Sequence, residues 1–169
     1  MNPKDLIARL KARKEPAPLV PKKVWDAELD QETEKLPDSE LKSALFLWND
    51  NLARAHEIAQ EIKTQTGSYL HGVMHRREPD YGNSKYWFER VGRHPAFPDV
   101  RAAALDLLAG PFQDLKHVRA GVDRQAEWDA FRMVDWCEEA AGKDADPRFV
   151  SFLHALQARE LEILTKQTV

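Results

Sequence analysis

Cysteine is almost missing from this sequence, whose only thiol is Cys137. One cysteine can form no intrachain disulfide, and it cannot supply the paired cysteines of zinc fingers or zinc ribbons. A fold held together by disulfides or by cysteine-bound zinc is therefore excluded. Such a chain suits a reducing compartment, so we expect a cytoplasmic protein. Cys137 itself fits a small core side chain better than a nucleophile.

Long hydrophobic runs and an excess of basic residues are absent as well. No segment approaches the roughly 20 apolar residues that cross a bilayer. Residues 1–20 mix charged with apolar side chains where a signal peptide has an apolar core, so we expect neither a membrane span nor a secretion signal. The formal net charge is −3. Nucleic-acid binding, which depends on a basic surface, is therefore not expected.

What the sequence does contain is enough apolar material for one core. Hydrophobic residues make up 43% of the 169 residues and include five Trp and seven Phe, enough to offset the entropy of ordering a domain. Because no alternating strand pattern occurs, we predict an all-α fold, a compact bundle of about six to seven helices. We expect one helical domain over residues 38–169 and an extended, proline-rich N-terminal arm over residues 1–37.

Helical spacing defines most of the expected elements. Residues 4–14 fit a short basic helix, and three prolines should keep residues 15–37 extended. Residues 38–63 are expected to form one long helix, with His56 at the edge of its apolar face. Further helices are expected over residues 68–77, 99–109, 111–119, 123–141 and 146–166, together with a short helix that ends at Gly92.

Glu160 projects close to the middle of the apolar face of the last expected helix. A buried carboxylate without a partner costs several kcal/mol. If the helix packs by that face, Glu160 must therefore meet a cation, a metal ion or a hydrogen-bond donor, or become protonated. We single it out as a candidate buried carboxylate.

Histidines give the clearest sign of a metal site. His71 and His75 are four residues apart, so their rings share one side of a helix. Neutral imidazole binds zinc and related divalent metals, but two nitrogens rarely suffice. His56 and His94 are the further candidate ligands. The zinc protease pattern HExxH is incomplete here, because Gln60 stands where its second histidine belongs.

Cations outnumber acids around these histidines and indicate a small anionic ligand. Guanidinium groups hold carboxylate or phosphate in bidentate fashion. A surface network of ion pairs would explain the same composition. Tyr86, Trp87 and Phe88 follow one another, so only part of this aromatic group can face the core. The candidate ligand-binding residues are Arg76, Glu78, Asp80, Lys85 and Arg90.

The stretch GSYLHGVMHRREPDYGNSKYWFERVGRHP resembles the signature of an uncharacterised microbial family of small helical proteins. In that signature a histidine-histidine-arginine run precedes a Lys-Tyr-Trp-Phe helix and then His-Pro. The likeness covers about Leu45 to Phe97, roughly a third of the chain. It implies a small helical protein, and it implies no activity, cofactor or catalytic residue.

Two functions remain open from the sequence. The first is a helical protein whose His- and Arg-rich site binds a small anionic molecule, with or without a divalent metal such as zinc. The second is an interaction or dimerisation module, in which the same cluster is structural. Trp25 in the arm would then be an aromatic contact for a partner or a second copy of the chain.

Overall fold

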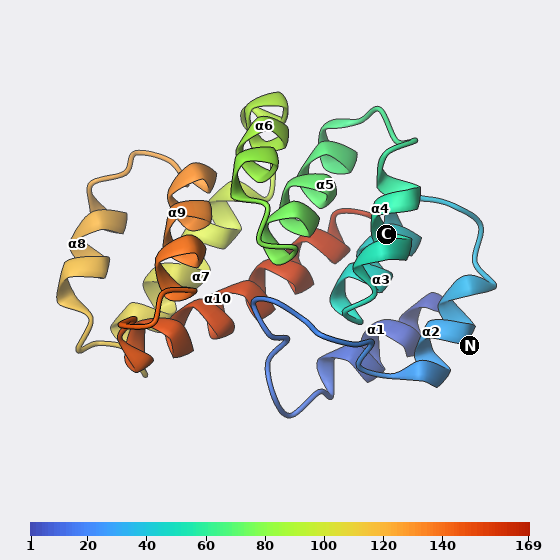
Figure 1. Ribbon diagram of the computed structural model, residues 1–169, viewed down its shortest axis with the longest axis horizontal. Coiled ribbons are helices and arrows are strands. Elements are labelled where there is room, and N and C mark those ends of the chain that lie inside the picture. The colour runs from blue at the N-terminus through green and yellow to red at the C-terminus, as the bar shows by residue number, and fades with distance from the viewer.

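The computed structural model describes residues 1–169 and is helical throughout, without a β-strand. The all-α prediction is confirmed, but six to seven helices is wrong, because there are ten (Figure 1). None of them is long and apolar enough to cross a bilayer. The helices are α1 (Pro3–Lys11), α2 (Ala27–Glu34), α3 (Glu40–Trp48), α4 (Leu52–Ala59), α5 (Gln65–Arg77), α6 (Tyr81–Val91), α7 (Phe97–Ala109), α8 (Lys116–Asp123), α9 (Ala130–Ala140) and α10 (Pro147–Lys166).

Two local features account for most of the difference in number. Residues 27–34 form α2, although we expected extended chain there, because Asp26 accepts hydrogen bonds from the backbone amides of Glu28 and Leu29 and nucleates the helix. The single helix expected over residues 38–63 is two helices. The break lies at Asp50, whose φ of 68° no helix accommodates, and Asn51 then caps α4.

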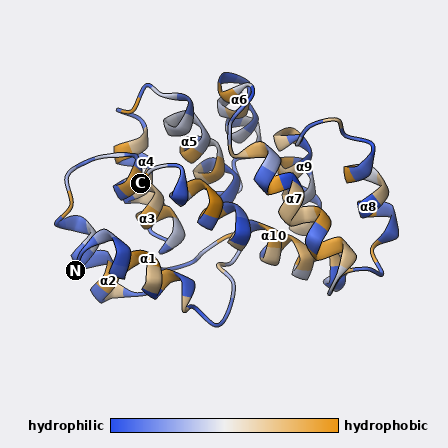
Figure 2. Ribbon diagram, turned by 180° about the vertical axis from the view of Figure 1, so that it is seen from behind, coloured by the Kyte–Doolittle hydropathy of each residue, from blue (hydrophilic) through white to orange (hydrophobic).

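The helices pack around one continuous core of 40 buried residues. The longest helix, α10, runs across the molecule and contacts α7, α3 and α9, while α5 lies between α4 and α6 (Figure 1). From the opposite side, hydrophobic residues gather on α3, α7 and α10, and the connecting loops are mostly hydrophilic (Figure 2). Leu6 and Leu10 of α1 belong to this core. Trp25 keeps 37% of its surface exposed, with the Arg13 guanidinium 4.9 Å above its ring.

A buried ion pair joins α5 to α10. The side chains of Arg76 and Glu160 are each only 1% exposed, and the two groups pair directly. Tyr69 donates a hydrogen bond to the same carboxylate over 3.0 Å. Burial alone would lower the pKa of Arg76, but the Glu160 carboxylate more than offsets this and the pKa is raised. The inward carboxylate of α10 is thus held by a cation and a hydroxyl donor.

The next residue, Arg77, forms a second buried pair on a different side of α5. Its guanidinium lies 2.5 Å from the Asp50 carboxylate, which also meets Arg13 at 2.8 Å. Arg77 further donates to the backbone carbonyls of Leu47 and Pro18. The ion pairs with Arg77 and Arg13 therefore hold Asp50 in its unusual backbone conformation. The pair with Arg77 also links α5 to the α3–α4 junction.

We expect Glu160→Gln to lower the free energy of unfolding by about 3 kcal/mol, because Arg76 would remain buried without its counter-charge. Urea unfolding followed by circular dichroism measures this loss. The matched control is Asp106→Asn, which removes a solvent-exposed pair with Arg159 and should cost less than about 1 kcal/mol. Equal losses in the two variants would contradict the structural role given to Glu160.

Candidate functional site

Three of the four candidate histidines come together where α4 packs on α5. One potential ligand atom from each of His56, His71 and His75 lies within 4.8 Å of the others. The rings of His71 and His75 are stacked, with centroids 5.0 Å apart, and His56 meets both rings edge-on. His71 and His75 are buried and His56 is half-buried. The cluster therefore sits at the rim of the core with one side toward solvent.

The close approach of α6 to α5 completes this arrangement. A Cβ atom on Gly72 would lie 3.0 Å from the Phe88 ring, so glycine lets the two helices approach. Ser84 donates a 2.7 Å hydrogen bond to the Gly72 carbonyl across the contact. This position of α6 places the Trp87 ring parallel to His71, with centroids 3.8 Å apart. Gly72 thus serves helix packing and, through it, holds an indole against the cluster.

The buried histidines are electrically neutral at physiological pH. Burial, reinforced by repulsion from His56 and His75, lowers the pKa of His71 to about 4. Burial also lowers the pKa of His75, against the opposing pull of Glu78 and Asp80. The Nδ1 atoms of both rings are buried without a hydrogen-bond partner. Native structures rarely leave such atoms unsatisfied, so these two call for a functional explanation.

Two carboxylates flank the cluster on its solvent side. Glu78 and Asp80 lie 3.5 Å and 3.9 Å from Nδ1 of His75. We assign the imidazole proton of His75 to Nδ1, because that atom faces negative charge, and the lone pair then belongs to Nε2. Carboxylates behind the N–H of a metal-binding histidine orient the ring and strengthen it as a ligand.

The other predicted residues lie elsewhere. Nδ1 of His94 accepts a hydrogen bond from the Ala96 amide and Nε2 lies 3.1 Å from the Thr66 hydroxyl, so both ring nitrogens are engaged away from the cluster. Arg76 is committed to Glu160, and Lys85 pairs with Asp135. Arg90 forms no ion pair and lies 5.5 Å over the Trp87 ring. The cations therefore do not converge on one point, and only Arg90 remains near the site, over the Trp87 ring that stacks on His71.

Sequence reasoning did not identify Trp87 as a neighbour of the cluster. Three aromatic residues in a row point to three sides of a helix, and the structure sends Phe88 to the core and leaves Tyr86 51% exposed. Trp87 lies between these extremes, half-buried on His71. Glycine at position 72, between the two histidines, was the one local signal that a neighbouring element approaches there.

Comparison of the chain with protein-family models, curated proteins and solved structures finds no match.

The low pKa of His71 predicts a pH-dependent stability. Between about pH 4 and pH 6.5 only the unfolded chain takes up this proton. The contribution of neutral His71 to the free energy of unfolding is therefore fully present above about pH 6.5 and is lost as the pH falls toward 4. We expect the urea midpoint of metal-free protein to decline over this interval. In His71→Gln the decline should be shallower, because one ring no longer titrates. An identical pH profile in the variant would contradict the assignment.

Proposed function

We propose that this protein binds one divalent metal ion, of the nitrogen-preferring kind represented by zinc, through His56, His71 and His75. The observation that carries the proposal is the gathering of three imidazoles from two helices, two of them neutral at physiological pH, together with a buried Nδ1 on His71 that has no hydrogen-bond partner. Neutral imidazole is the form that coordinates zinc. No proton has to be removed from these two rings before the ion enters.

The spacing of the nitrogens is close to what such an ion requires. Nitrogens around tetrahedral zinc are about 3.4 Å apart, and in the cluster the potential ligand atoms lie within 4.8 Å. Closing this gap requires the imidazole rings to rotate about their side-chain torsions. The half-buried His56 is the ring with room to move, since His71 is held against Trp87.

Three protein nitrogens leave a fourth position for water or substrate, as in catalytic rather than structural zinc sites. A zinc-bound water loses its proton near neutral pH. Glu78 and Asp80 lie behind Nδ1 of His75, where they would orient that ring and strengthen it as a ligand, and the unpaired Arg90 next to Trp87 would attract an anionic substrate. These residues support hydrolysis of a small anionic compound as the chemistry of the site.

Metal binding is tested with untagged protein, first for metal content by mass spectrometry and then, after chelation, by calorimetric titration with Zn²⁺. We expect one ion per chain. His71→Gln and His75→Gln should each weaken binding by at least about a hundredfold, whereas His117→Gln, which changes an exposed histidine on α8, should bind as the native chain does. Circular dichroism verifies that each variant is folded.

Zinc at a hundred times its dissociation constant should also stabilise the folded chain by about 2.7 kcal/mol. For a domain of this size that raises the melting temperature by roughly 5–10 °C. No heat of binding and no thermal shift in the native chain would refute the metal site. Unchanged affinity in both His71→Gln and His75→Gln would show that zinc binds somewhere else.

A further inference from the structure

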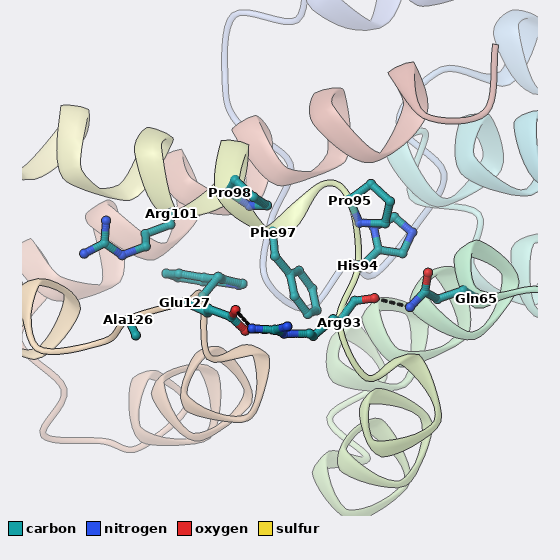
Figure 3. Close-up of a pocket in the computed structure, with 10 residues that line it drawn as sticks. Gln65, Arg93, His94, Pro95, Phe97, Pro98, Arg101, Ala126 and Glu127 are labelled. Atoms are coloured by element: carbon teal, nitrogen blue, oxygen red, sulfur yellow. Dashed lines mark hydrogen bonds and ion pairs between the residues drawn. The ribbon is translucent and has the colours of Figure 1, made fainter.

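A second site is suggested by a cavity of about 530 Å³ that lies between the start of α7 and the loop joining α8 to α9. It includes none of His56, His71 and His75. Its volume falls within the range of small-molecule sites, roughly 300–1,000 Å³. Figure 3 shows the cavity as an elongated space, with Arg101 toward one end, Gln65 toward the other and Phe97 between them.

The walls of the cavity are apolar and held in place by the core. Phe97 and Trp128 line it and are only 8% and 5% exposed. The Phe97 ring packs edge-on against Tyr69 with centroids 5.4 Å apart, and Trp128 packs against Trp136. Pro95 and Pro98 add two rigid rings. Such walls suit a flat apolar group, which would bind without rearranging them.

Two donors at the cavity lack acceptors. The indole Nε1 of Trp128 and the Nε of Arg101 are both buried without a hydrogen-bond partner. Arg101 forms no ion pair, and its single hydrogen bond runs 3.4 Å from Nη2 to the Val122 carbonyl. Most arginines of this chain have a carboxylate partner, so a guanidinium without one, in the same lining as an unused N–H group, indicates that an acceptor comes from outside.

The charged residues of the lining indicate whether the acceptor group of the ligand is negatively charged or neutral. The only carboxylate in the lining is Glu127, and it is already paired with Arg93. Figure 3 shows this pair beside the Phe97 ring, where it joins the loop before α7 to the loop before α9. Within this pair the two charges cancel. Arg101 therefore remains as the one charge of the lining that has no counter-charge.

We propose that this cavity binds a small organic carboxylate, with the carboxylate held by the Arg101 guanidinium and the Trp128 indole N–H, and a flat apolar body lying against Phe97. The proposal stands apart from the metal site, because the two share no residue.

The experiment uses 2-naphthoate as the probe and its uncharged analogue 2-naphthamide as the matched ligand. Two-dimensional ¹⁵N–¹H spectra of the native chain resolve the indole N–H signals of its five Trp, and Trp128→Phe identifies the signal of Trp128. We expect naphthoate to shift that signal saturably and the other four much less. Naphthamide should bind at least about tenfold more weakly, since it lacks the charge that Arg101 meets.

Arg101→Gln should weaken naphthoate binding by at least about tenfold, whereas Arg119→Gln, at an exposed position on α8, should leave it unchanged. His71→Gln should also bind naphthoate normally, which separates this site from the metal site. Equal affinity for naphthoate and naphthamide in the native chain would overturn the proposal, and that comparison requires no variant to fold. Undiminished binding in a folded Arg101→Gln would overturn it as well.

Discussion

The placement of α5 depends on two adjacent buried arginines. Arg76 pairs with Glu160 of α10, and Arg77 pairs with Asp50 at the α3–α4 junction. Consecutive residues project about 100° apart around a helix, so the two pairs hold α5 from two directions. Rotation or sliding of α5 would bury at least one uncompensated charge, at a cost of several kcal/mol. The orientation of every other side chain on this helix follows from that constraint.

The histidine cluster is a direct result of this fixed orientation. His75 immediately precedes Arg76, and His71 lies one turn earlier on the same side as His75. With Arg76 and Arg77 both directed inward, this side of α5 faces α4 and the Trp87 of α6. His71 and His75 therefore lose solvent without gaining a hydrogen bond at Nδ1, and burial lowers the pKa of both rings. Stability and the metal-binding potential of the site arise from neighbouring residues on one helix.

The sequence alone predicted those features that depend on local periodicity. The all-α class, the end of α6 at Gly92 and the helical spacing of His71 and His75 were all accessible in this way. It could not predict features decided by distant charges. The run Asn49-Asp50-Asn51 favours turns and helix caps, but the charges that hold the break at Asp50 come from Arg77 and Arg13, which are 27 and 37 residues away. Separation of His94 from the other histidines likewise depends on its hydrogen bonds to Thr66 and Ala96.

The parallel contact between Trp87 and His71 gives the site a built-in optical probe. An indole only 3.8 Å from an imidazole changes its emission when the electronic state of that imidazole changes. A copper or nickel ion bound to the histidines would quench the fluorescence of Trp87, because only the His71 ring would separate the two. The buried indoles of Trp48, Trp128 and Trp136 lie outside the cluster. Occupancy of the proposed metal site can therefore be followed by tryptophan fluorescence, without a label and in the intact chain.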